Sequence, residues 1–163
     1  MTTSSKETAA TTGTPRRIAL FTGTFDPFTI GHKSIVDRAM GLFDEIIIGI
    51  GVNSAKTPWI PLEKRLRDIR AIYSGNPRIT VDTFSGLAVE YARSRGARYL
   101  LRGVRSVADF EYERNMADAN RMIGPGAPVE TILIPALPAL SAISSSLVRE
   151  LARFGAQYTH LLP

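Results

Sequence analysis

Apolar segments of five to eight residues alternate with segments of helical periodicity along the whole chain, and this alternation restricts the possible folds most. The expected strands cover residues 17–21, 45–52, 78–84, 97–101 and 129–135. The expected helices cover residues 31–42, 62–73, 86–95, 106–122 and 144–155. Ile46, Ile47 and Ile48 follow one another without a polar residue, which is typical of a strand buried on both faces. The pattern predicts an α/β fold: a doubly wound parallel five-stranded sheet with helices on both faces.

Polar and small residues gather directly after four of these strands. In a Rossmann-like sheet of this kind, ligands bind at the carboxyl ends of the strands, near the point where the strand order changes. The first strand is followed by "TGTFDPFTIGH", the second by "NSAKTP", the fourth by "RGVRS" and the fifth by "ALPALSAISSS". Glycine, hydroxyl, lysine, arginine and histidine groups are therefore expected at one edge of the sheet, as in a phosphate-binding site.

Composition limits the remaining possibilities. The 163 residues suffice for one well-buried domain, and without cysteine there is neither a disulfide nor a thiolate ligand. The Ser/Thr-rich residues 1–15 predict a flexible tail before a single domain over 16–163. No apolar run reaches the roughly 20 residues of a membrane helix. These features favour a cytoplasmic protein with no membrane partner.

The net charge of +5 is compatible with nucleic acid and equally with small phosphorylated ligands. Basic residues are interleaved with acidic ones, as in "RLRDIR", and no basic tract stands out. Nucleic-acid binding is therefore the weaker interpretation, and a phosphorylated small molecule is the expected ligand.

His32 is the first candidate catalytic residue. It stands on the first turn of the helix that begins after Gly31, where unpaired backbone N–H groups attract an anion, and Gly23 allows close approach to the backbone. Its imidazole can donate to a phosphate oxygen, or carry a charge when the ligand favours protonation. A histidine here can also simply cap or pack the helix start, but its position after a strand and a glycine favours the functional role.

Arg102 and Arg105 are expected on the turn between the fourth strand and its helix. Each guanidinium offers a planar fork that suits phosphate oxygens, although a surface arginine pair looks the same in sequence. Ser106 and Asp109 have the spacing of a capping box at the next helix. Lys56 and the serines 144–146 follow the second and fifth strands, where a solvated lysine and simple helix caps are the commoner interpretations.

Several blocks of the sequence resemble a known family. Thr29-Ile30-Gly31-His32 resembles the T-x-G-H signature of the nucleotidyltransferase superfamily, and "ISSSLVRE" resembles its I-S-S-T-x-x-R signature, with Ser146 replacing threonine. With "GTFDPFTIGH" and "LRGVRSVADFEYE", they resemble the phosphopantetheine adenylyltransferase family over residues 17–163. The resemblance implies an enzyme of coenzyme A biosynthesis that transfers the adenylyl group of ATP to 4′-phosphopantetheine, giving dephospho-coenzyme A and pyrophosphate.

The resemblance also implies roles for individual residues. The implied catalytic residues are His32, Lys56 and Arg105. The implied phosphopantetheine-binding residues are Thr24, Lys56, Ala88 and Arg102. The implied ATP-binding residues are Thr24, Phe25, His32, Gly103, Val104, Arg105, Glu113, Leu140, Ser141, Ala142, Ile143, Ser144, Ser145 and Ser146. Residues 140–142 depart from the family pattern, which has an aromatic pair at this place.

The implied mechanism is direct in-line attack by the acceptor phosphate on the α-phosphorus of ATP, without a covalent intermediate. Mg²⁺ is expected to arrive with ATP, and the lack of a D-x-D or His/carboxylate motif predicts few or no protein ligands to it. Asp26, beside Pro27, is open as a metal ligand or as a turn residue. Kinship further implies a homohexamer and feedback binding of coenzyme A in the same pocket.

Two alternatives stay open. An adenylyltransferase acting on nicotinamide or nicotinate mononucleotide would keep the phosphate-binding motifs and change the acceptor pocket around Lys56, Ala88 and Arg102. A non-catalytic nucleotide-binding module, or a basic RNA-binding module, would bind without releasing pyrophosphate. The presence of His32, Lys56 and Arg105 argues against this second class.

Overall fold

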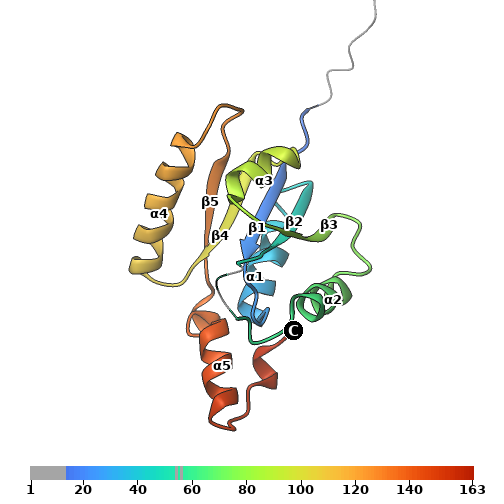
Figure 1. Cartoon of the computed structure of the whole chain (residues 1–163), viewed down its shortest axis with the longest axis vertical. Coiled ribbons are helices and arrows are strands. Elements are labelled where there is room, and N and C mark those ends of the chain that lie inside the picture. Colours follow the sequence, from blue (N-terminus) through green and yellow to red (C-terminus); the bar gives the residue numbers. More distant parts are fainter. Residues whose placement is uncertain (1–13, 54, 56) are drawn as a thin grey trace, which may run out of the picture.

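A computed structural model of the chain describes residues 14–53, 55 and 57–163. These residues form a five-stranded sheet with the strand order β3-β2-β1-β4-β5, in which all neighbours are parallel. The strands are β1 (Ile18–Gly23), β2 (Glu45–Gly51), β3 (Ile79–Phe84), β4 (Tyr99–Val104) and β5 (Glu130–Pro135). Figure 1 shows the strands side by side at the centre of the molecule. The predicted doubly wound α/β fold is confirmed.

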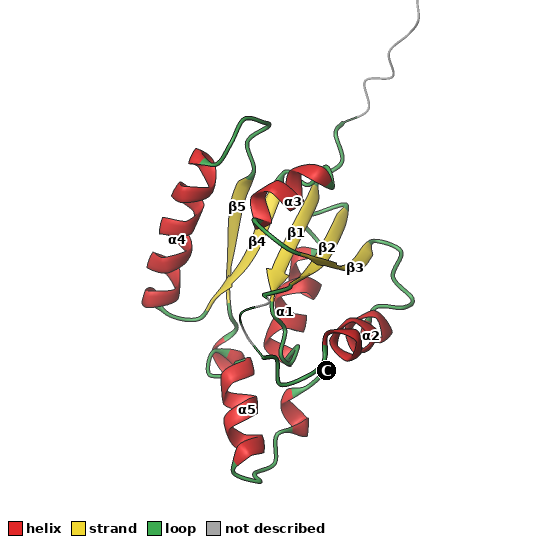
Figure 2. Ribbon diagram, viewed as in Figure 1, coloured by secondary structure: helices red, strands yellow, loops and turns green. Residues whose placement is uncertain are grey.

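Helices cover both faces of the sheet. Helices α1 (Ile30–Ala39) and α2 (Leu62–Ile72) pack on one face, and α3 (Ala88–Ser94) and the end of α4 (Val107–Met122) pack on the other. Helix α5 (Ser145–Arg153) lies beyond the carboxyl ends of the strands (Figure 2). Two short 3₁₀ helices, Pro138–Leu140 and Thr159–Leu161, flank α5 in the chain.

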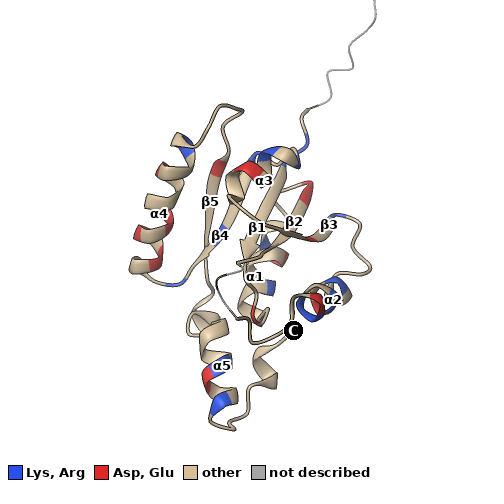
Figure 3. Cartoon of the chain, in the orientation of Figure 1, with Lys and Arg blue, Asp and Glu red and all other residues tan. Residues whose placement is uncertain are grey.

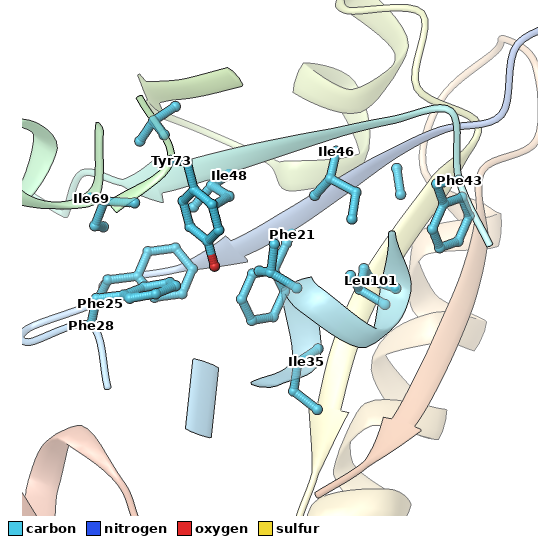
Figure 4. Close-up of a cluster of buried hydrophobic side chains, with 14 of the residues drawn as sticks. Phe21, Phe25, Phe28, Ile35, Phe43, Ile46, Ile48, Ile69, Tyr73 and Leu101 are labelled. Carbon is cyan, nitrogen blue, oxygen red and sulfur yellow. The ribbon is translucent and has the colours of Figure 1, made fainter. Parts of the chain in front are cut away.

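The consecutive isoleucines of β2 point alternately into two hydrophobic cores. Ile46 and Ile48 belong to the core under α1 and α2, whereas Ile47 belongs to the core under α3. All three are at most 1% exposed, because both faces of this strand are covered. Figure 4 shows Ile46 and Ile48 in the first core, beside the rings of Phe21 and Tyr73.

The strand order changes direction at β1. The chain proceeds outward from β1 to β2 and β3, and then returns to place β4 on the other side of β1. The two crossovers diverge at this point, so the carboxyl ends of β1 and β4 border an open region, as expected for a doubly wound sheet. Helix α1 reaches across to β4, where Ile35 packs against Gly103.

One strand differs from the prediction in a way that matters for the site. The fourth strand was expected over 97–101, but β4 runs from Tyr99 to Val104. Arg102 and Gly103 therefore lie within the sheet, and only Arg105 lies on the turn that follows. The mismatch arises because an arginine and a glycine resemble a loop in sequence, whereas Arg102 is accommodated by partners on β1 and α4.

Figure 3 shows basic and acidic residues together on several helices, including α2 and α5. Within the described ranges, no helix combines the length and apolar character needed to cross a bilayer. The expected tail over 1–15 falls almost wholly on residues 1–13, outside the described part of the chain, so the predicted domain division stays a prediction.

Candidate active site

A cleft of about 450 Å³ opens at the carboxyl ends of β1 and β4, where the strand order changes. Its wall is formed by the end of β1 and the loop to α1, by the end of β4 and the first turns of α4, and by the segment that leads from β5 into α5. The lining residues are Phe21, Thr22, Gly23, Thr24, Phe25, Thr29, Gly31, His32, Ile35, Arg102, Gly103, Arg105, Asp109, Tyr112, Glu113, Ala136, Leu140, Ile143, Ser144, Ser145 and Ser146.

Three helices begin at this cleft. The first turns of α1, α4 and α5 contribute His32, Asp109 and Ser145 to its wall. The first N–H groups of a helix have no partner within the helix, and they carry a partial positive charge. Three such helix starts around one cleft make it a suitable site for a ligand with several phosphate groups.

The helix cap of α1 fixes the orientation and the tautomer of His32. Thr29 caps the helix, since its hydroxyl accepts from the backbone N–H of His32 at 3.4 Å. In return, the backbone N–H of Thr29 donates to Nδ1 of His32 at 3.0 Å. Because Nδ1 acts as an acceptor, the neutral ring carries its proton on Nε2. The imidazole thus presents an N–H donor from a fixed position in the wall of the cleft.

Aromatic rings surround the same imidazole. The ring centroids of Phe25 and Phe28 lie 5.2 and 5.4 Å from that of His32, and Phe21 follows at 6.3 Å. Burial among these rings and, to a smaller extent, the nearby positive charges of Arg105 and Arg102 together lower the pKa of His32 from 6.5 to about 4. His32 is therefore neutral near pH 7, so it acts as a hydrogen-bond donor rather than as a cation.

Arg102 is held in place from two sides. Its Nε and Nη2 donate to the two carboxylate oxygens of Glu113 at 2.9 and 2.7 Å, in a bidentate pair. Its Nη1 donates to the carbonyl and hydroxyl oxygens of Thr22 on β1, at 2.6 and 3.0 Å. Glu113 is 8% exposed, so this carboxylate is a buried anchor for the guanidinium. The pair gives Arg102 a fixed position in the wall between β1 and α4.

Arg105 is held less tightly. Its Nε donates to Asp109 at 3.1 Å, and no hydrogen bond of its Nη groups occurs within the described residues. The expected capping box at Ser106 forms only by half. The Ser106 hydroxyl accepts from the backbone N–H of Asp109, but the Asp109 carboxylate accepts from the N–H of Arg105 instead of Ser106. Asp109 therefore orients Arg105 toward the cleft.

The three serines at the start of α5 have distinct partners. Ser144 is the N-cap, and its hydroxyl accepts from the N–H of Leu147 at 3.1 Å. Ser145 donates to the carbonyl oxygen of Pro27 at 2.8 Å, and the Ser146 hydroxyl accepts from Arg149 at 3.1 Å. Capping does not remove the start of α5 from the cleft, because all three serines line it.

Most residues expected at the site line this cleft, and a few do not. The lining includes twelve of them: Thr24, Phe25, His32, Arg102, Gly103, Arg105, Glu113, Leu140, Ile143, Ser144, Ser145 and Ser146. Four others are not part of the lining: Ala88, Val104, Ser141 and Ala142. Val104 is 8% exposed and belongs to the core, and Ala88 packs with the core under α3. Lys56 lies outside the described residues.

Several lining residues were missed in the sequence. On α4, Asp109 stands three residues before Tyr112 and four before Glu113, the spacings that place a side chain on one helix face with its partner. That spacing was a usable signal. Thr22 was missed because nothing in the sequence indicates that its carbonyl and hydroxyl groups receive Arg102 from a strand 80 residues away.

Asp26 is a structural residue of the loop between β1 and α1. Its two carboxylate oxygens accept from the backbone N–H groups of Trp59 and Ile60, each at 2.7 Å. Of the two possibilities left open by the sequence, the turn residue is the one that this geometry favours. Within the part of the chain that the structure describes, no group of three or more histidine and carboxylate side chains is placed to hold a metal ion.

Comparison with known proteins agrees with this arrangement. Residues 20–151 match the family described as cytidylyltransferase-like. The chain is 48% identical to the phosphopantetheine adenylyltransferase of Phocaeicola vulgatus over 147 residues, covering 90% of this chain and 95% of the relative. It is 48% identical to the enzyme of that name from Porphyromonas gingivalis, covering 91% and 95%, and 43% identical to the one from Synechocystis sp., covering 90% and 91%.

A solved structure shares the fold at much lower sequence similarity. It is a bifunctional NMN adenylyltransferase/ADP-ribose pyrophosphatase from Francisella tularensis, in complex with AMP and a manganese ion. The TM-score is 0.62 at 14% identity; the match covers 90% of this chain and 44% of that longer one. At this identity the similarity concerns the fold alone.

Proposed function

Because this chain belongs to the phosphopantetheine adenylyltransferase family, we propose that it transfers the adenylyl group of ATP to 4′-phosphopantetheine. The products are dephospho-coenzyme A and pyrophosphate. The observation that carries the proposal is the fixed Nε2–H donor of His32 in a cleft where three helices begin. This arrangement suits a polyphosphate whose α-phosphate gains negative charge during transfer.

The reaction needs positioning and charge stabilisation rather than a covalent intermediate. An oxygen of the acceptor phosphate forms a bond to the α-phosphorus, while the bond from that phosphorus to the bridging oxygen of the β-phosphate breaks. The electron pair of the broken bond leaves with pyrophosphate. We assign the Nε2–H of His32 to the α-phosphate oxygen, where it stabilises the developing charge.

The leaving pyrophosphate requires positive groups of its own. We assign Arg105 and the first turn of α5, with its serines 144–146, to the β- and γ-phosphates. Mg²⁺ accompanies ATP as part of the substrate and neutralises phosphate charge.

Arg102, Thr24 and Lys56 are assigned to the acceptor side. Arg102 reaches the cleft with its guanidinium already paired to Glu113, so we propose that it acts as a rigid positive edge of the acceptor site. Thr24 is exposed in the cleft wall next to Phe25, where its hydroxyl is available to the incoming phosphate. Lys56 is assigned on the sequence resemblance alone.

A direct assay tests the proposal. The purified protein is incubated with ATP, Mg²⁺ and 4′-phosphopantetheine, and dephospho-coenzyme A is detected by mass spectrometry alongside pyrophosphate release. Parallel reactions contain nicotinamide mononucleotide or nicotinate mononucleotide as acceptor. Product from phosphopantetheine alone supports the proposal, and faster turnover of either mononucleotide contradicts it.

We further propose a cytoplasmic homohexamer that binds coenzyme A in the same cleft. Helix α4 supports an assembly. It has one buried residue along its 16 residues, and it exposes several large apolar side chains. These side chains are Val107, Phe110, Tyr112, Met116 and Met122. Light scattering coupled to gel filtration measures the mass of the assembly, and competition of coenzyme A with ATP tests the shared site.

A further inference from the structure

We propose that Asp26 and Arg65 are positioning residues, which together set the place of the acceptor-side segment relative to the nucleotide cleft. The inference rests on the proposed function, because it uses the division of the cleft into a nucleotide side and an acceptor side. Neither residue lines the cleft, so both act through backbone groups that they hold.

The two side chains connect distant parts of the chain through four hydrogen bonds. Asp26 accepts from the N–H groups of Trp59 and Ile60, each at 2.7 Å. Arg65 of α2 donates from Nε to the carbonyl of Ile60 at 2.9 Å, and from Nη1 to the carbonyl of Thr24 at 2.5 Å. We call these four bonds the Asp26–Arg65 clamp. It joins residues 24–26, at the end of β1, to residues 59–60, at the entry to α2.

Both charged side chains of the clamp are buried. Asp26 is 8% exposed and Arg65 is 7% exposed, and both bond backbone groups, whereas the ion pairs of the described residues lie mostly on the surface. Burial of a charge is costly unless hydrogen bonds compensate for it, and apolar side chains usually stabilise a core as well or better. The main contribution of the clamp is therefore to fix the position of one segment relative to the other, rather than to increase the free energy of unfolding. Such a fixed relative position is useful where two reactants must meet within a fraction of an ångström.

One clamped segment forms part of the cleft wall, and the other follows Lys56, which is assigned to the acceptor side. Thr24 and Phe25 line the cleft beside His32, and Lys56 lies three residues before Trp59 in the sequence. The other end of the same connection is also held, because the N–H of Val52 donates to the carbonyl of Phe84 at 2.9 Å. Described anchors thus stand on both sides of Lys56 in the chain.

The loop that carries Asp26 is held to the nucleotide side as well. Arg149 of α5 donates to the carbonyl of Asp26 at 2.6 Å, and Ser145 donates to that of Pro27. Residues 24–27 are therefore hydrogen-bonded both to α5 and to residues 59–60. Loss of the clamp is expected to disturb the acceptor side and to leave the nucleotide side intact, since the contacts to α5 do not depend on the Asp26 carboxylate.

The test is the variant Asp26→Asn, which keeps the size of the side chain and turns one acceptor oxygen into a donor facing a backbone N–H. Asp68→Asn is the matched control, because the Asp68 side chain is 45% exposed on α2 and pairs with Lys64 at the surface. We expect kcat/KM for phosphopantetheine to fall about ten- to hundred-fold in Asp26→Asn. The dissociation constant for ATP, measured by calorimetry, should change less than about three-fold.

A second variant and a local probe complete the experiment. Arg65→Lys keeps the charge but replaces the planar fork, so it should lower acceptor kcat/KM in the same direction and also leave ATP binding intact. Trp59 is the single tryptophan of the chain, so its fluorescence reports on the clamp in each folded variant. A clamp that merely stabilised the fold would affect ATP and acceptor equally.

The outcomes separate this inference from the proposed function. If the wild-type protein forms no dephospho-coenzyme A, the proposed function fails. If the wild type is active, an unchanged acceptor kcat/KM in folded Asp26→Asn and Arg65→Lys overturns the clamp. Equal losses of ATP affinity and of acceptor kcat/KM overturn it too. A selective loss on the acceptor side, with Asp68→Asn like the wild type, supports it.

Discussion

Replacing His32 by asparagine separates the two functions that this residue combines. In the wild type, Nδ1 accepts from Thr29 and closes the start of α1, while Nε2 presents a donor to the cleft. The Oδ1 atom of asparagine is attached to Cγ, as Nδ1 is in histidine. His32→Asn therefore keeps an acceptor near the N–H of Thr29 but has no donor in the place of Nε2. His32→Ala removes both groups.

The expected magnitudes follow from these contacts. Loss of one preorganised donor to a developing oxyanion costs about 3–4 kcal/mol, which corresponds to a decrease in turnover of about a hundred- to a thousand-fold. Both variants should show this loss. His32→Ala also leaves the buried N–H of Thr29 without its partner, which costs about 1–3 kcal/mol of folding free energy. His32→Asn should stay within about 1 kcal/mol of the wild type in stability near pH 7.

The low pKa of His32 adds a dependence on pH. Its pKa is about 4 in the folded protein and 6.5 in the unfolded chain. Above pH 6.5 the ring is neutral in both states, and as the pH falls the unfolded state binds the proton first. Folding stability therefore decreases between pH 6.5 and 4, by on the order of 2 kcal/mol at pH 5 for this residue. His32→Asn cannot take up this proton, so its loss of stability toward acid should be smaller by that amount.

Two measurements check this reasoning. Steady-state pyrophosphate release at saturating ATP gives the turnover of each variant, and urea unfolding at pH 7 and pH 5 gives the stabilities. A near-normal turnover of His32→Asn would falsify the role of the Nε2–H donor. Equal destabilisation of the asparagine and alanine variants at pH 7 would show that the bond to Thr29 does not stabilise the helix start.

Other substitutions test separate parts of the structure. Among the described residues, the buried hydroxyl of Tyr73 has no hydrogen-bond partner, so Tyr73→Phe should raise the free energy of unfolding by about 1 kcal/mol at unchanged activity. Tyr91→Phe removes bonds to Asp82 and Arg95 and should lower it. Gly103→Ala would place a Cβ 3.1 Å from Cγ1 of Ile35; we expect a destabilisation of about 1–2 kcal/mol in thermal unfolding, and no change in melting temperature would contradict this packing. Lys56→Ala should lower kcat/KM for phosphopantetheine more than the affinity for ATP, and separate titrations of the two substrates would reveal the opposite order.

The fold was largely predictable because its signals are local. Ile46, Ile47 and Ile48 indicate a strand covered on both faces, and the structure places them alternately in the two cores. The starts of α4 and α5 were predictable for the same reason, since Ser106 and Ser144 act on residues of their own first turn. Each of these inferences needs only a few neighbouring residues.

The segments that form the cleft were predictable from the sequence, but their internal contacts were not. The residues after each strand indicated which segments would meet at the cleft. The pairing of Arg102 with Glu113 and Thr22, and the bonds of Asp26 to Trp59 and Ile60, depend on how segments far apart in the chain are packed. A single sequence carries no local signal for such contacts. The same contacts distinguish a fixed guanidinium such as Arg102 from a less restrained one such as Arg105.

The order in which the walls of the cleft occur along the chain has a consequence for biosynthesis. The first three strands and two helices can bury much of one core while the ribosome is still adding the rest of the protein. The wall that faces His32 is completed only when β4 and the serines of α5 have emerged, near position 146. A nucleotide therefore cannot assist the early steps of folding, and it stabilises the protein only after the start of α5 has been added to the chain.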